Sequence, residues 1–221
     1  KLVASTLSVL SASQLGSIST DAIAKLSTSA LNGLTTSQVK GLTTSQLVAL
    51  TTDQAAKLSG DQVAALTTVQ LSSLATDDFA ALSTAAIANL SVSQFKALGT
   101  DQLVALTTAQ AAKLTTDQVK ALSASQIAKM ETADLAKFST AHIQALSTAA
   151  VAALTTDQFQ SLATNQIASL SSAQIKALTT DQLVALSTDQ AAKLTTDQVK
   201  ALSATQIAKI ETADLAKLGT A

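Results

Sequence analysis

The sequence predicts an all-α solenoid: a superhelix of about 28 very short capped helices, one in each eight-residue repeat, with a leucine-lined axial core. Three observations lead to this fold class: an apolar residue every eight positions, a helix-capping signature after it, and charges sorted to helix ends. The first is unbroken, because all 28 positions from Leu2 in steps of eight to Leu218 are apolar. No insertion or deletion interrupts the 27 steps, so the octad is a structural period.

A period of eight fits neither one long helix nor a regular strand. Eight residues turn an α-helix by about 800°, so the leucine row would drift by about 80° per octad. A second apolar row follows five residues after the first, as at Val39 and Leu47, and this spacing puts the two rows on opposite faces of a strand. The chain must therefore bend once per octad, with both rows in a shared core. The leucines expected in that core include Leu42, Leu50, Leu106, Leu114, Leu122, Leu178, Leu186 and Leu194.

Each octad then begins with a helix N-terminus. In the segment LTTDQVKAL, residues 114–122, Thr115 as the N-cap places Gln118 at N3, which forms the S/T-x-x-Q capping box. Ser or Thr occupies the cap position in 21 of 28 octads, and Gln occupies N3 in 18 of 27. The same register pairs Thr43 with Gln46 and Thr195 with Gln198.

The charged residues mark both ends of each helix. Every Asp falls in the first turn, both Glu fall at the cap position, and all 14 Lys fall in the last two positions before the next leucine-row residue. This is the arrangement that the helix dipole favours. Each octad is thus expected to hold a helix of roughly one and a half turns, about 10 Å long. A helix this short is unstable alone, so neighbouring coils must stabilise it.

A β-solenoid with one short strand per octad is the alternative architecture, since Thr, Val and Ile favour strands. Its coils would need residues that turn tightly, whereas the chain has no Pro and only six Gly in no regular phase. Abundant Ala, Gln and Lys also favour helix. The helical interpretation is therefore preferred.

Residues 1–221 are expected to form one continuous solenoid, as a segment of a longer chain, because the sequence begins without Met and already in register. A longer period lies over the octads. Residues 101–141 nearly recur as residues 181–221, an offset of 80 residues or ten octads. Such duplication indicates an array that grows by copying blocks.

The composition excludes several kinds of chemistry. The chain has no Cys, and its 14 basic residues are all Lys, so disulfides, thiol chemistry and bidentate Arg clamps are excluded. A net charge of −1 gives no electrostatic case for nucleic acid, and no apolar run is long enough to span a membrane. We expect no enzymatic activity, cofactor, metal or small-molecule substrate.

Two candidate sites have simpler explanations. His142, the single His, stands where Gln is usual, and no second His or Cys could complete a metal site. Asp77 and Asp78 are the one adjacent acidic pair, and their positions at a helix start account for both. The spaced Asp residues along the chain, usually one per octad, are interpreted as solvated helix starts because Ca²⁺ needs several oxygens in one loop.

The octads also resemble a known group of repeats. The pattern L-[ST]-T-x-Q-[IVL]-x-x-L, as in LTTSQVKGL from Leu34 and LTTDQLVAL from Leu178, is similar to the Thr/Gln-rich octad arrays of very large proteobacterial surface or secreted proteins, which are often adhesin-like. The resemblance covers the whole chain. It implies an extracellular or cell-surface location and a structural role, and no catalytic residue carries over from it.

Two functions follow as expectations. The first is a rod, stalk, spacer or filament-forming segment, with partners that are copies of the chain, end to end or side by side, or other surface components. The second is an adhesion module that recognises a protein or glycan through the solenoid face. A binding array should show a localised cluster of departures from the consensus, whereas the exchanges here are scattered, so the structural role is preferred.

Overall fold

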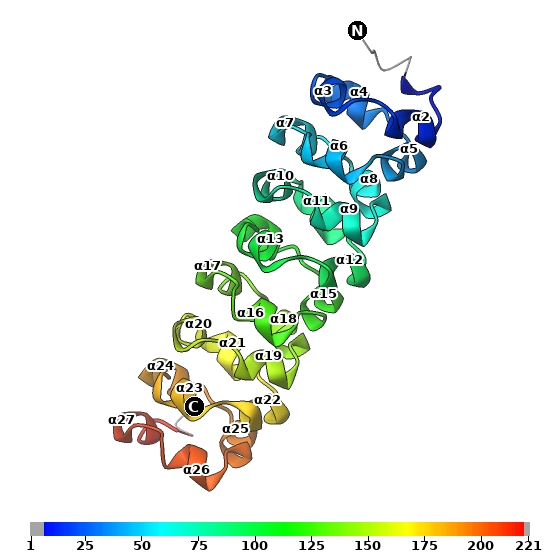
Figure 1. Cartoon of the computed structure of the whole chain (residues 1–221). Helices are drawn as coiled ribbons and strands as arrows, with labels where there is room; N and C mark the ends of the chain where they lie inside the picture. The colour runs from blue at the N-terminus through cyan, green and yellow to red at the C-terminus, as the bar shows by residue number, and fades with distance from the viewer. Residues whose placement is uncertain (1–6, 219–221) are drawn as a thin grey trace. The chain divides into compact units, whose positions relative to one another are not determined.

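The structure is a computed structural model that describes residues 7–218. In these residues all regular secondary structure is helical, in 26 helices of four to six residues, and there is no strand (Figure 1). The prediction of an all-α solenoid with one short helix per octad is confirmed, and the β-solenoid alternative is wrong. Leu2, the first member of the leucine row, lies outside the described residues.

The described chain divides into two compact units, of which the first ends at Leu114 and the second begins at Thr115. The helices of unit 1 are α2 (Ala12–Gly16), α3 (Thr20–Ala24), α4 (Thr28–Asn32), α5 (Thr36–Lys40), α6 (Thr44–Val48), α7 (Thr52–Ala55), α8 (Gly60–Ala65), α9 (Thr68–Ser72), α10 (Thr76–Ala81), α11 (Thr84–Ala88), α12 (Val92–Lys96), α13 (Thr100–Val104) and α14 (Thr108–Ala111). The helices of unit 2 are α15 (Thr116–Lys120), α16 (Ala124–Ile127), α17 (Thr132–Leu135), α18 (Thr140–Ala145), α19 (Thr148–Ala152), α20 (Thr156–Gln160), α21 (Thr164–Ala168), α22 (Ser172–Ala177), α23 (Thr180–Val184), α24 (Thr188–Ala192), α25 (Thr196–Ala201), α26 (Ala204–Ile207) and α27 (Thr212–Leu215).

Within each unit, a helix packs against the helix three octads later, which lies in the next coil. In unit 1, α2 contacts α5 and α5 contacts α8; in unit 2, α19 contacts α22 and α22 contacts α25. Each helix therefore has neighbours in the coils before and after it, as in other α-solenoids.

Two extended residues, the leucine-row residue and the cap residue that follows it, bend the chain between one helix and the next. Leu66 has φ −61° and ψ 143°, and the following cap residue, Thr67, has φ −69° and ψ 162°. The next helix starts at once, because the cap carbonyl accepts its first hydrogen bond. None of the described glycines has a positive φ, so the bend needs no left-handed residue. This explains why Gly is scarce and irregular in position.

The two apolar rows form the core of each unit. Second-row residues such as Leu47, Leu103 and Leu183 are completely buried. The eight leucine-row residues singled out from the sequence (Leu42, Leu50, Leu106, Leu114, Leu122, Leu178, Leu186 and Leu194) have relative exposures of 3% to 6%. In the last described helices the second row is less covered, with Ile207 37% and Leu215 38% exposed.

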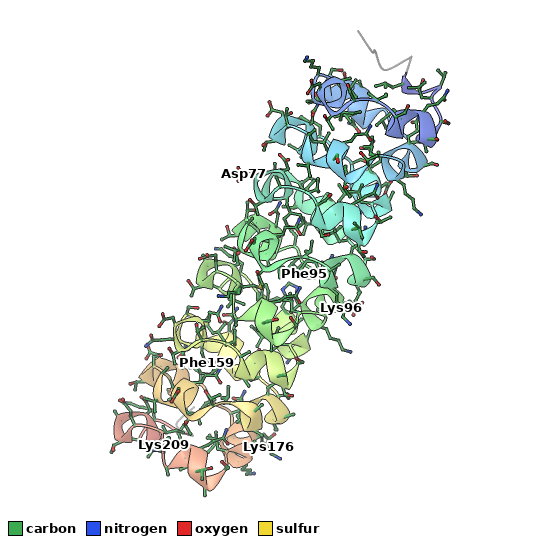
Figure 2. The ribbon with its side chains drawn as sticks, in the orientation of Figure 1. Asp77, Phe95, Lys96, Phe159, Lys176 and Lys209 are labelled. Atoms are coloured by element: carbon green, nitrogen blue, oxygen red, sulfur yellow. The ribbon has the colours of Figure 1, made fainter. Side chains whose placement is uncertain are left out.

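Phenylalanine side chains lie inside this core, whereas lysine side chains lie on the surface. Phe95 in unit 1 and Phe159 in unit 2 are enclosed by their coils, whereas Lys96 and Lys176 project from the surface (Figure 2). None of the helices between residues 7 and 218 has the length and apolar character needed to cross a membrane.

Candidate functional site

The most regular buried polar feature of the chain is a row of glutamines at the N3 position, here called the ladder glutamines. In the described residues, 17 glutamines have relative exposures of 7% or less. They are Gln38, Gln46, Gln54, Gln62, Gln70, Gln94, Gln102, Gln110, Gln118, Gln126, Gln158, Gln166, Gln174, Gln182, Gln190, Gln198 and Gln206. A buried amide costs free energy unless its oxygen and nitrogen are both hydrogen-bonded, so their partners matter.

The amide oxygen of a ladder glutamine caps its own helix. The Thr43 backbone N–H donates to Gln46 Oε1 at 2.8 Å, and the Gln46 N–H donates to Thr43 Oγ1 at 3.2 Å. The sequence-predicted pairs Thr115 with Gln118 and Thr195 with Gln198 have the same two bonds. Both bonds satisfy N–H groups that a helix start leaves without a partner.

The amide nitrogen of the same residue reaches the preceding coil. Gln46 Nε2 donates to the Leu15 carbonyl at 2.8 Å and to the Ile18 carbonyl at 2.7 Å, which are 31 and 28 residues earlier. Gln198 Nε2 makes the same bonds to Ile167 and Leu170, at 2.9 and 2.7 Å. These carbonyls belong to the end of a helix four octads earlier. The Leu15 and Ile167 carbonyls also accept the N–H three residues later, at 3.1 Å, so the glutamine adds a second donor there. One side chain thus caps the start of one helix and the end of another.

This double role explains why N3 is Gln rather than Glu. A carboxylate could accept the cap N–H and would interact well with the helix dipole, but it has no hydrogen to donate to the carbonyls of the preceding coil. Sequence reasoning found the capping half of this site and missed the half that joins coils. The missed signal is the choice of Gln in 18 octads where capping alone would accept Glu.

Contacts and ladder bonds together indicate how many octads make one superhelical turn. In unit 1, α2 contacts α5 and α9 contacts α12, three octads apart, whereas Gln70 of α9 bonds to the Leu42 carbonyl after α5, four octads earlier. One turn within a unit therefore takes between three and four octads. In unit 2, α15, α18, α22 and α25 are joined in the same way, through the Gln174 bond to Leu146. Figure 1 places α2 and α12 along one edge of unit 1, and α15 and α25 along one edge of unit 2.

Asp78 replaces a ladder glutamine in α10 and is buried. The Thr52 hydroxyl, in α7, donates to Asp78 Oδ1 at 3.0 Å. Burial raises the pKa of the Asp78 carboxyl above its usual value; the hydrogen bond from Thr52 opposes that rise, and the charge of Asp77 adds to it. The expectation that the acidic residues are solvated helix starts is wrong for Asp78, and also for Asp134 and Asp214, because N3 faces the preceding coil.

Asp134 occupies the same position in α17, at 2% relative exposure. Its Oδ2 atom has no hydrogen-bond partner. Burial, with a contribution from the negative charge of Glu131, raises the pKa of Asp134 to about 6. Protonation would give this carboxyl a hydrogen to donate, as the Gln amide has. The raised pKa of Asp134 therefore results from its burial at the position that joins two coils.

His142 takes the Gln position in α18 and reproduces the capping bond. The Ser139 backbone N–H donates to His142 Nδ1 at 3.3 Å, and the His142 ring lies edge-on to Phe138 with centroids 5.3 Å apart. An accepting Nδ1 places the hydrogen of the neutral ring on Nε2. Between residues 7 and 218, no group of three or more His, Cys, Asp or Glu is placed to hold a metal ion.

Comparison with known proteins gives one family. A family profile described as the ALTTAQ repeat matches residues 24–60, 33–68, 71–108, 127–164 and 159–188. Together these segments cover more than half of the chain. No curated protein matches the sequence.

Proposed function

Because this chain belongs to the ALTTAQ repeat family, we propose that it is a structural repeat protein that acts as a stalk, spacer or filament-forming segment of a bacterial extracellular surface protein. The repeat character comes from the family; the role and the location are the proposal.

The ladder glutamines carry this proposal. Their buried polar atoms are used to cap helices and to join coils, with the same bonds in coil after coil of each unit, as at Gln46 and Gln182. Each bond contributes about 0.5–1.5 kcal/mol net, so a long array is held by many equivalent bonds. A fold in which every coil adds the same stabilising contacts can be lengthened without redesign, which suits a spacer.

The proposed location rests on the resemblance of the octads to arrays in proteobacterial surface proteins. Self-association belongs to the same proposal. Copies would contact end to end or side by side.

Electron microscopy of the secreted full-length material tests the structural role. Rods or fibres are the expected particles, and compact round particles would contradict the proposal. Antibody labelling of intact and permeabilised cells tests the location separately. Equal labelling of both is expected, and labelling of permeabilised cells alone would contradict a surface location.

An adhesion module is the second candidate, and exposed valines favour it. Val69 is 66% exposed and Val48 is 55% exposed, both in unit 1, and both are more exposed than Val92 and Val104 of the same unit. Binding of the chain to a glycan array or to host-cell extracts, lost in a Val48→Thr, Val69→Thr variant, would support this function. The matched control is Val104→Thr, at another exposed site, which should leave binding unchanged. Val63→Thr cannot serve as a control because Val63 is buried.

A further inference from the structure

The ladder of unit 1 has one gap between described coils, and it spans two consecutive helices. Helix α10 carries Asp78 and α11 carries Ala86 at the ladder position. Neither side chain has the amide nitrogen that would reach the carbonyls after α6 and α7. By the register of the other coils, 28 residues earlier, those carbonyls belong to Leu50 and Leu58.

The bonds from a ladder glutamine to the carbonyls four octads earlier are here called a ladder link. Because each link spans four octads, any separation between two successive helices breaks four consecutive links. A break between α5 and α6 severs the links of Gln46, Gln54, Gln62 and Gln70, all of which are present. A break between α8 and α9 crosses the links expected of α9 to α12. Of these, Gln70 and Gln94 make theirs, and the two at α10 and α11 are missing.

One hydrogen bond partly replaces what is missing. Thr52 of α7 donates to Asp78 of α10, three octads later, so a single hydroxyl–carboxylate bond stands where two glutamines would each bond at least two carbonyls. The apolar rows continue through this region, with Phe79 and Ile87 fully buried. The coils are therefore packed here but have fewer hydrogen bonds between them.

We propose that unit 1 has a built-in yield point at α8 and α9, where successive coils separate first on thermal opening or under axial load. In a solenoid, stability is a sum of repeat and nearest-neighbour terms, so the interface with the fewest bonds opens most often. This inference goes beyond the proposed function and does not depend on where the protein is located.

Hydrogen exchange of the full chain, followed by mass spectrometry, tests it. Fraying from the chain ends alone would make protection rise steadily toward the middle of unit 1. The yield point predicts a minimum at α8 and α9 (60–72), below α5 and α6 (36–48) and below α21 and α22 (164–177), where all four links are present. Protection at 60–72 equal to or above that of either comparison segment would overturn the proposal.

A double variant tests the cause. Asp78→Gln with Ala86→Gln restores both amide nitrogens and should slow exchange at 60–72 by roughly ten- to a hundredfold. Thr76→Gln with Ala85→Gln is the matched control, because it adds the same side chains to exposed positions in the same two helices, keeps the charge of Asp77 beside Asp78 and should change nothing. A folded ladder variant with unchanged exchange would show that the missing bonds are not the cause.

A single variant keeps the test decisive if the double variant does not fold. Thr52→Val removes the one replacing hydrogen bond and should speed exchange at 60–72 by roughly three- to tenfold, with 164–177 unaffected. Unchanged exchange at 60–72 in a folded Thr52→Val protein would contradict the proposal.

Discussion

At the scale of the residue, one amide side chain joins local and long-range structure. The oxygen of a ladder glutamine bonds three residues back along the chain, and its nitrogen bonds 28 and 31 residues back. Both groups are buried, so neither can exchange its partner for water. The identity of this residue is therefore constrained more tightly than capping alone would require.

Gln182 in unit 2 gives a direct test of that constraint. Gln182→Glu keeps the oxygen that accepts from Thr179 but places a carboxylate against the Val151 and Leu154 carbonyls, both 2.8 Å from the present Nε2. We expect a loss of about 3 kcal/mol in the free energy of unfolding at pH 7, measured by urea denaturation. Gln182→Ala should cost less, about 2 kcal/mol, because it buries no charge. If Gln182→Glu were as stable as the wild type, the donor role of Nε2 would be wrong.

Asp134 predicts a pH dependence of the opposite kind to that of a salt-bridged acid. Its pKa is raised from 3.8 to about 6 in the folded chain, so the folded state binds more protons than the unfolded state between these values. Its stabilising contribution is present below about pH 4 and is lost as the pH rises through about 6, on the order of 3 kcal/mol.

Thermal unfolding of wild type and Asp134→Asn from pH 4 to pH 7 measures this effect. The wild type should lose stability across that range, and the variant should lose less. Asp157→Asn, an exposed acid at a helix start in the same unit, is the control and should follow the wild type. Parallel curves for wild type and Asp134→Asn would contradict the assignment.

At the scale of the element, the sequence alone predicted what depends on neighbours within one octad. The cap at Thr195, its partner Gln198 and the helix between two leucines all follow from spacings of three to eight residues. The bonds from Gln198 to Ile167 and Leu170 do not, because they depend on the number of octads in a turn, which no short spacing encodes. For the same reason the burial of Asp78 was missed: its octad looks like a normal helix start, and only the preceding coil covers it.

The helix starts that depart from the pattern give a prediction at this scale. Helix α21 begins after Ala163, which makes no side-chain cap, although its N–H still donates to Gln166 Oε1 at 2.7 Å. The Gln166 N–H donates to the Ala163 backbone carbonyl at 2.9 Å, and Ala163→Ser adds the hydroxyl acceptor that the usual cap provides, so it should raise the free energy of unfolding by about 1 kcal/mol. Ala153→Ser, at the end of a helix in the same unit, has no such N–H to cap and should not stabilise. Equal effects would show that the hydroxyl acts through something other than capping.

At the scale of the whole molecule, the long period of the sequence is a whole number of octads. The near-duplication is ten octads long, and within each unit a helix meets helices three and four octads away in the neighbouring coils. Copying a block of this length adds whole octads, so the capping and coil-joining positions stay in register. In unit 2, α15 and α25 carry Lys120 and Lys200, which are 80 residues apart, and lie along the same edge (Figure 1).

The core and the ladder should accept a change in the number of octads, because each octad presents the same bonding groups to its neighbours. Deleting residues 156–163 removes one octad and joins Thr155 to Thr164, which leaves the sequence LTTNQIASL in register. Every following ladder glutamine then meets carbonyls in the same position of an equivalent octad. We therefore expect helicity per residue and the urea midpoint, both measured by circular dichroism at 222 nm, to change little.

Deleting residues 156–159 is the matched control: it removes half an octad, puts Gln160 directly after Thr155 and breaks the leucine spacing. That variant should lose cooperative unfolding of unit 2. If the whole-octad deletion were equally disruptive, stability would depend on specific partners between coils, and the equivalence of octads that underlies the spacer proposal would be wrong.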